Sequence, residues 1–185
     1  KEAVEKRLDA KQREDLSKLL EEKNITLVFE NVDQENDGHI IKYDHSELYL
    51  LDAINNDLKY SKYSYEDTQK IATRFGFVHK LQGPTINNWQ EFYDWYNKVT
   101  SDNKYQYNGR LIEGFVIEDS AGYMVKIKLT YYHFWKFMRA IMAETISNGY
   151  ITDTQKLATP LANYFYGWLK HWCEQYETKD ERIAN

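Results

Sequence analysis

Two lysines and a nearby carboxylate are the residues of this sequence whose types and spacing best suit chemistry. Lys126 and Lys128 alternate with apolar residues in the stretch MVKIK, and Glu113 opens the apolar stretch EGFVI that precedes it. Because side chains alternate between the two faces of a strand, the two ammonium groups lie on the same face. Lysines neutralise phosphate oxygens, and a carboxylate holds Mg²⁺ directly or through water. The trio therefore suits a site for a metal-bound nucleotide.

The same pattern has a simpler interpretation. Lysines that alternate along a strand usually mark its solvent-exposed face. A glutamate opposite them then forms a cross-strand ion pair that contributes about 0.2–1 kcal/mol. The spacing alone favours this ordinary half-exposed hairpin over a functional site.

A β-hairpin is predicted to position the trio. Residues 111–118 and 123–129 are rich in branched and aromatic side chains, and Ser120, Ala121 and Gly122 lie between them. Small and glycine residues of this kind supply tight turns between antiparallel strands. The hairpin thus allows a carboxylate from one strand to meet lysines from the other.

The residues around this hairpin also resemble the motifs of a known superfamily. EGFVI followed after a short turn by KIK resembles motifs IV and V of the covalent nucleotidyltransferases, which are the RNA ligases, DNA ligases and mRNA capping enzymes. Upstream, LVFENV at residues 27–32 resembles motif III, and LYLLDAI at residues 48–54 resembles motif IIIa. The aromatic-rich segment TYYHFWKFMRAIM that follows KIK is most similar to the phage-type (T4 RNA ligase 1-like) RNA ligases and to the ligase domain of fungal tRNA ligases. DNA ligases and capping enzymes usually continue into an OB-fold instead.

The resemblance implies roles for the hairpin residues and for one upstream carboxylate. Lys126 and Lys128 are expected to stabilise charge on the ATP α-phosphate, and Glu113 to hold Mg²⁺ or its water shell. Glu30, at the end of the predicted strand over residues 24–32, is expected to contact the nucleotide ribose or a metal-bound water. An ordinary exposed carboxylate at a strand end is the alternative for Glu30.

Motif IIIa lines the purine pocket in this superfamily. The resemblance therefore implies that Tyr49 or Leu51 touches adenine. The segment is nearly continuous apolar sequence, which equally predicts a plain buried strand. Both interpretations suit the pattern.

The nucleophile of the superfamily is a lysine in a K-x-D-G or K-x-N-G motif, and the 185 residues contain no such motif. In the family this lysine lies before motif III. We therefore expect the C-terminal portion of an ATP-dependent RNA ligase, with its nucleophile upstream of Lys1, and we expect this portion alone to be inactive.

The complete protein is expected to seal RNA 5′-phosphate and 3′-hydroxyl ends through lysyl-AMP and RNA-adenylate. The implied partners are RNA ends from tRNA or other broken RNA, ATP, Mg²⁺ and the missing N-terminal half of the same protein. A non-catalytic nucleotide- or RNA-binding module that keeps a ligase-like fold is the alternative.

Composition sets further bounds. The net charge of −5 has the wrong sign for binding nucleic acid by bulk electrostatics. Any RNA contact must therefore be local, or must be made by sequence outside these 185 residues. The single cysteine, Cys173, cannot form an internal disulfide and is interpreted as a packing residue. No signal peptide and no long apolar run is present, so we expect a cytoplasmic protein that does not enter the membrane.

The predicted fold class is α+β, with a mixed or antiparallel sheet of a ligase domain flanked by helices. Residues 1–130 are assigned to the C-terminal part of the adenylyltransferase domain, and residues 131–185 to a helical extension. Helices are predicted over residues 5–23, 65–75 with Ser64 as N-cap, 88–99 and 131–147, and a last one begins after Thr159 as N-cap. A turn at residues 37–38 is predicted to lead into a further strand over residues 39–43.

Overall fold

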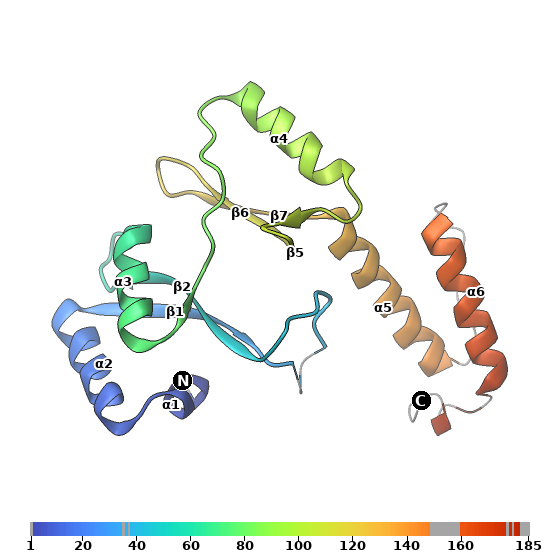
Figure 1. Cartoon of the computed structure of the whole chain (residues 1–185), viewed down its shortest axis with the longest axis horizontal. Helices are drawn as coiled ribbons and strands as arrows, with labels where there is room; N and C mark the ends of the chain where they lie inside the picture. Colours follow the sequence, from blue (N-terminus) through green and yellow to red (C-terminus); the bar gives the residue numbers. More distant parts are fainter. Residues whose placement is uncertain are drawn as a thin grey trace. The chain divides into compact units, whose positions relative to one another are not determined.

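The computed structural model of the chain describes residues 2–34, 36, 38–148, 160–176, 178, 180 and 181. It has the α+β architecture that the sequence predicts, with helices and small sheets (Figure 1). The chain divides into two compact units, Lys1–Ile86 and Asn87–Asn185. This division reflects packing, and the functional boundary expected at residue 130 stays a prediction.

Two helices open the first unit, where the sequence predicted one over residues 5–23. Helix α1 spans Glu2–Arg7 and α2 spans Ala10–Lys23. Asp9 separates them because its side chain accepts a hydrogen bond from the backbone N–H of Gln12 at 2.8 Å, while the Gln12 side chain accepts from the Asp9 N–H at 3.0 Å. This reciprocal capping box satisfies two amide donors and begins a new helix at that point.

A three-stranded sheet follows. Strands β1 (Ile25–Val32) and β2 (Glu47–Asn55) are antiparallel, and the short β3 (Val78–His79) runs parallel to β2. The ladder contains a β-bulge: Val28 pairs with Asp52 and Phe29 pairs with Leu50, which leaves Leu51 as the extra residue of β2. Beyond a bulge of this kind, the alternation of side chains is shifted by one position.

One face of this sheet is covered by helices. Helix α3 spans Tyr65–Phe75, and its predicted N-cap is confirmed because the Ser64 side chain accepts a hydrogen bond from the Asp67 N–H. Leu50 and Ala53 are both fully buried although they are three residues apart, which is the result of the bulge. They join a core whose other buried members are Leu8, Leu16, Ile25, Ile71, Ala72, Phe75 and Phe77.

The strand predicted over residues 39–43 is wrong. The described residues of this segment make bends, and they pack through their rings. The His39 ring lies 5.3 Å from that of Tyr43, which lies 6.3 Å from that of Tyr49 in β2. Asp37, the first residue of the predicted turn, lies outside the described residues.

The second unit begins with helix α4 (Trp89–Ser101), capped by Asn88, and continues through two small antiparallel sheets. Strands β4 (Gln106–Tyr107) and β5 (Arg110–Leu111) form the first. Strands β6 (Gly114–Glu118) and β7 (Met124–Lys128) form the second, which is the predicted hairpin. The strand predicted over residues 111–118 is thus divided between two sheets.

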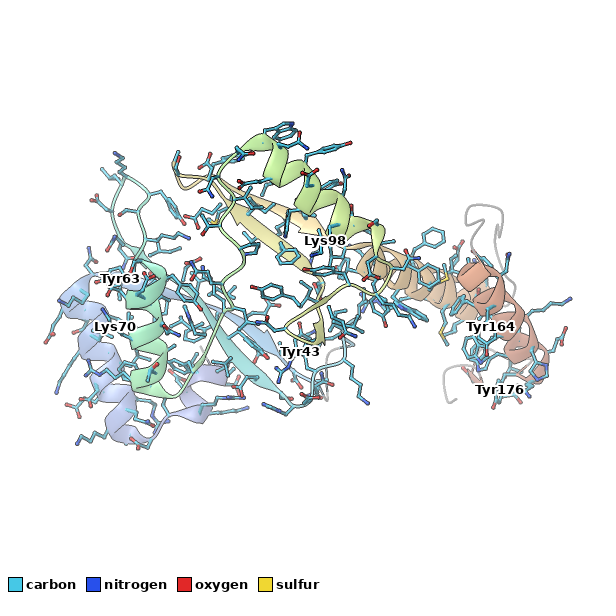
Figure 2. All side chains as sticks on the ribbon, turned by 45° about the horizontal axis from the view of Figure 1, so that its top comes forward. Tyr43, Tyr63, Lys70, Lys98, Tyr164 and Tyr176 are labelled. Carbon is cyan, nitrogen blue, oxygen red and sulfur yellow. The ribbon has the colours of Figure 1, made fainter. Side chains whose placement is uncertain are left out.

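Two helices end the described part of the second unit, α5 (Thr130–Asn148) and α6 (Pro160–Gln175). They pack together through a cluster of buried side chains: Met138, Ile141, Ala162, Tyr166, Leu169 and Trp172. Tyr164 lies on α6 and is 76% exposed (Figure 2). The predicted cap Thr159 lies outside the described residues. Within the described ranges, no helix combines the length and the apolar character needed to cross a membrane.

Candidate functional site

The hairpin turn is built around an aspartate that the sequence analysis did not single out. The Asp119 carboxylate accepts hydrogen bonds at 2.9 Å from the backbone N–H groups of Ala121 and Tyr123. Its backbone also bonds to Gly122 and Tyr123 across the turn. Gly122 has a φ of +83°, a conformation that favours glycine. The expected turn residues therefore form the turn, and Asp119 fixes it.

The register of the hairpin places both lysines on one face, as alternation predicts. Lys128 pairs with Gly114, and Lys126 pairs with Val116. A Cβ atom on Gly114 would lie 2.8 Å from the Cα of Lys128, so only glycine permits this approach of the two strands. The start of β6 and the end of β7 therefore lie close together at the Gly114–Lys128 pair.

The opposite face of the hairpin is fixed by aromatic packing. The ring of Phe115 lies 5.0 Å from that of Trp95 on α4 and contacts the rings of Tyr105 and Tyr107 edge-on. Such edge-to-face pairs are worth about 0.5–1.5 kcal/mol each beyond their buried area. Helix α4 and the β4–β5 segment thereby pack against the hairpin, through Phe115 of β6, on the face opposite the lysines.

The predicted meeting of a carboxylate and lysine occurs at the end of this hairpin. Oε2 of Glu113 lies 2.5 Å from Nζ of Lys128, and the two side chains are 29% and 33% exposed. The Glu113 carbonyl oxygen also accepts a hydrogen bond at 2.9 Å from the N–H of Leu129, which is buried. Lys126 is exposed, and no carboxylate pairs with it among the described residues. The carboxylate thus pairs with one lysine of the two.

An aromatic ring completes this group. The Lys128 ammonium lies 4.3 Å from the ring centroid of Tyr132, which belongs to the first turn of α5. The Lys136 ammonium lies 5.7 Å from the same centroid. Sequence reasoning missed this contact, although the spacing of four residues along a helix could have indicated it. Two cations therefore share one ring beside the hairpin.

The donor set fits a magnesium ion held mainly by water. The described residues contain no group of three or more histidine, cysteine, aspartate or glutamate side chains that could hold a metal. Nucleotide-bound Mg²⁺ does not need one, because it keeps several waters and takes one or two carboxylates together with phosphate oxygens. Glu113, half-buried beside a lysine, is suited to that role.

The other predicted site residues belong to the first unit. Glu30 pairs with Tyr49 across the β1–β2 ladder, so both lie on the same face of the sheet. Leu50 and Phe29 face the helices, so Glu30 and Tyr49 lie on the face opposite them. The bulge brings Asp52 to that open face as well. Leu51 is the bulged residue itself and has no partner across the ladder.

A half-buried ionic cluster on this open face was missed by the sequence analysis. Oδ1 of Asp52 lies 2.7 Å from Nζ of Lys80 and 3.3 Å from Nζ of Lys62. The side chains are only 16%, 31% and 15% exposed. The signal in the sequence was Asp52 itself, an acidic residue inside the apolar run LYLLDAI.

His79 lies next to this cluster in the sequence, and its ring packs 4.4 Å from that of Tyr65. Both ring nitrogens are buried without a hydrogen-bond partner. Burial lowers the pKa of His79 below its usual value, and the charge of Lys80 lowers it further. The folded protein therefore favours the neutral form of the ring more than the unfolded chain does.

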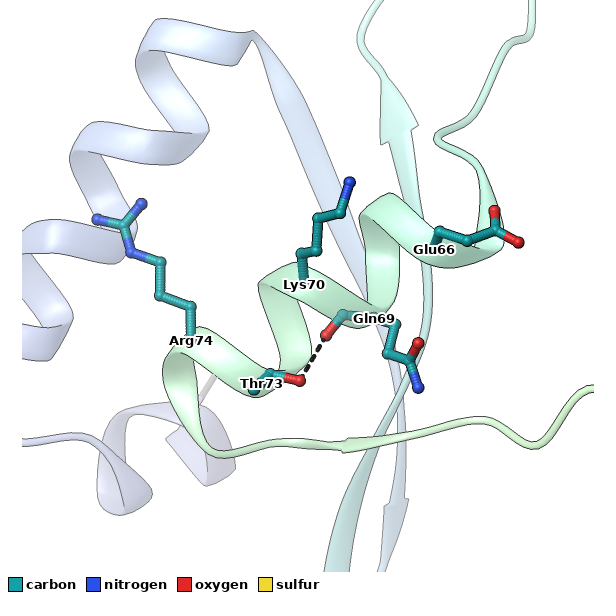
Figure 3. A pocket seen from close by; sticks show the side chains of 5 residues that line it. All are labelled: Glu66, Gln69, Lys70, Thr73 and Arg74. Atoms are coloured by element: carbon teal, nitrogen blue, oxygen red, sulfur yellow. Dashed lines mark hydrogen bonds between the residues drawn. The ribbon is translucent and has the colours of Figure 1, made fainter.

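The surface also carries an open hollow on the outer side of α3 (Figure 3). Its lining side chains all extend from that helix and are exposed, and the Thr73 hydroxyl donates to the Gln69 carbonyl. A depression of this kind, lined by one helix, carries no convergent polar groups. The hairpin group of the second unit and the open sheet face of the first therefore remain two separate candidates, each described by itself. The hollow is lined by Glu66, Gln69, Lys70, Thr73 and Arg74.

Comparison with known proteins identifies the family of this chain. A tRNA ligase of Candida albicans is 31% identical to the chain over 111 residues, which cover 59% of this chain and 13% of that protein. The chain thus spans a small part of the length of this curated relative. The model of a family described as RNA ligase, of the T4 RNA ligase 1 type, matches residues 1–132. Because that match covers most of the chain, the chain belongs to this RNA ligase family.

Proposed function

We propose that this chain supplies the nucleotide-phosphate and metal contacts of an ATP-dependent RNA ligase. The observation that carries the proposal is the contact of Glu113 with Lys128, with Lys126 on the same hairpin face, in a chain of the RNA ligase family. The carboxylate is opposite in charge to Mg²⁺, and the two ammonium groups are opposite in charge to a phosphate. The tRNA ligase name of the curated relative supports RNA ends as the substrate.

The proposed reaction has three displacements at phosphorus. A lysine nitrogen, contributed by sequence outside these 185 residues, attacks the α-phosphate of ATP, loses its proton and expels pyrophosphate. An oxygen of the RNA 5′-phosphate then takes AMP from that lysine. Finally the RNA 3′-hydroxyl attacks the 5′-phosphate, loses its proton and expels AMP, which joins the strands.

Within this reaction each residue has a separate task. Lys126 and Lys128 donate hydrogen bonds to the α-phosphate oxygens, on which negative charge accumulates during each displacement. Glu113 would hold Mg²⁺ directly or through water, and the ion would neutralise phosphate charge. Glu30 is proposed for the ribose, and Tyr49 or Leu51 for adenine.

The pairing of Glu113 with Lys128 bears on how this site is prepared. Each side chain holds the other in place in the absence of nucleotide, because a charge-assisted hydrogen bond joins them. A phosphate would then take up the lysine donors, and a metal ion the carboxylate. The pair therefore places a carboxylate for the metal ion and an ammonium group for the phosphate side by side before either ligand binds.

Intact-mass spectrometry tests the proposal. The protein with its complete N-terminal sequence is incubated with ATP and Mg²⁺, beside the 185-residue chain as control. We expect an increase by the mass of AMP on the complete protein alone, which is lost on treatment with hydroxylamine at mildly acidic pH. No increase on either protein would instead favour a non-catalytic module that binds nucleotide or RNA.

A further inference from the structure

The ring of Tyr132 contacts two ammonium groups, of which that of Lys128 also pairs with the carboxylate of Glu113. Lys136 is exposed, and within the described part of the chain no acidic side chain pairs with it. Its ammonium contacts the Tyr132 ring at 5.7 Å, and Lys128 contacts that ring at 4.3 Å. An aromatic ring attracts a cation through its quadrupole and carries no net charge. The ring therefore orders the Lys136 ammonium without neutralising its charge.

The direction of α5 makes this group continuous with the hairpin. Tyr132 and Lys136 are four residues apart and so lie on the same face of the helix. The buried residues Met138, Ile141 and Thr145 lie on the opposite face, which packs toward α6. The Tyr132 face is thus left accessible, one helical turn beyond the end of β7.

The local balance of charge on this surface is positive. Lys126, Lys128 and Lys136 contribute three ammonium groups to it. Glu113 pairs with Lys128, and Glu118 lies on the same hairpin face at the turn end of β6. The whole chain has a net charge of −5, so the charge of this surface is opposite in sign to that of the protein. A local excess of ammonium groups creates a field that attracts anions.

We propose that Lys136 forms a second phosphate-binding position next to the Lys126–Lys128 position, with the Tyr132 ring in contact with both Lys128 and Lys136. This inference rests on the proposed function, because it extends the same site. The group that Lys136 would bind is a phosphate adjacent to the reacting phosphate in the same substrate molecule. Two sources have that chemistry: the RNA backbone beside the 5′-end, and the β- and γ-phosphates of ATP.

Fluorescence anisotropy with a 5′-phosphorylated oligoribonucleotide tests the RNA source. Binding to the 185-residue chain is measured over a series of salt concentrations, for wild type and Lys136→Gln. Loss of one contact to a single-stranded backbone reduces the slope of log K against log salt by about 0.7. We expect that reduction together with a several-fold loss of affinity that does not depend on RNA sequence.

Three further variants separate this role from a structural one. Lys136→Arg keeps the charge and the contact with the ring, so it should retain the wild-type slope. Tyr132→Leu removes the ring and should lower affinity in the same direction as Lys136→Gln. Lys170→Gln changes an exposed lysine of α6 and should leave the slope unchanged. Equal slopes for wild type, Lys136→Gln and Lys170→Gln would exclude the RNA source.

The ATP source is tested in the complete protein by the dependence of AMP labelling on ATP concentration. If Lys136 holds the β- or γ-phosphate, Lys136→Gln raises the KM for ATP and leaves RNA binding unchanged. If both RNA binding and this KM equal those of wild type, the inference is wrong. Failure of the proposed function would differ, because wild type itself would then take no AMP.

Discussion

A Cβ atom added to Gly114 would lie 2.0 Å from the carbonyl oxygen of Ile127. The clash is with backbone rather than with a flexible side chain, so the strands must separate to relieve it. We expect Gly114→Ala to lower the free energy of unfolding by about 1–3 kcal/mol or more, as overpacking does in tight regions. Urea denaturation followed by tryptophan fluorescence measures this, because Trp95 packs on the hairpin through Phe115.

A matched control exists in the same unit. Gly167 lies within α6, and nothing lies within 4 Å of a Cβ atom added there. Gly167→Ala should therefore be neutral or stabilising by up to about 1 kcal/mol, since alanine favours helix. Equal stability of Gly114→Ala and wild type would show that the close approach of β6 and β7 is not required.

Glu113 and Lys126 are expected to be essential for AMP transfer in the complete protein. Removal of one electrostatic stabiliser typically costs about 10²–10³-fold in rate. Glu113→Ala and Lys126→Ala should each reduce the rate of AMP labelling by at least this factor, measured by mass spectrometry over time. Lys98→Ala, which removes an exposed lysine of α4 (Figure 2), should label at the wild-type rate. Near-normal labelling of Glu113→Ala would reject the assignment of metal binding to that carboxylate.

Asp52 is expected to stabilise the first unit. Asp52→Asn leaves Lys62 and Lys80 close together with their carboxylate removed, on a face where both are largely buried. Hydrogen bonds to charged groups are worth about 1.5–3 kcal/mol, and we expect a loss of that size in the free energy of unfolding. Glu14→Gln breaks an exposed pair with Lys18 and should cost no more than about 0.5 kcal/mol. A cost for Asp52→Asn as small as that of the control would contradict this prediction.

His79 should make the stability of the first unit depend on pH. Its pKa in the folded state is lowered from the value of 6.5, mainly by burial. The unfolded state therefore binds more protons than the folded state just below pH 6.5, and the free energy of unfolding falls as the pH is lowered through this value. The fall from this group ends once the pH is below the lowered pKa.

The comparison of His79→Phe with wild type isolates that contribution. The variant keeps a ring against Tyr65 and removes the titrating group, so its stability should change less between pH 7.5 and pH 5.5. His171→Gln, which alters an exposed histidine, should keep the wild-type dependence on pH. Identical pH profiles for wild type and His79→Phe would mean that burial of the ring does not shift its titration.

Local patterns predicted the elements that depend on neighbouring residues. Ser64 as a helix cap and the turn at Gly122 follow from short-range rules, and the structure confirms both. The hairpin bearing Lys126 and Lys128 was predictable because alternation is a local property of a strand. The motif resemblance then led to the family that the comparisons show.

The remaining features depend on contacts between distant segments. Asp52 and Lys80 are 28 residues apart, and only the parallel pairing of β2 with β3 brings them together. The helix predicted across residues 5–23 failed because the capping box at Asp9 outweighs the continuous helical pattern. The roles of Glu30, Tyr49 and Leu51 in binding nucleotide stay predictions.

The extra residue in β2 has a consequence for how this strand can change in evolution. Tyr49 and Asp52 share one face of the sheet, although they are three residues apart, because the bulge removes Leu51 from the alternation. Replacement of Leu51 by another side chain would keep both residues on that face. Deletion of Leu51 would make Leu50 and Asp52 consecutive opposite Phe29 and Val28, so Asp52 would stay on the open face and Ala53 on the side of the helices. This position should therefore tolerate both substitution and deletion, because the bulged residue takes no part in the alternation of its neighbours.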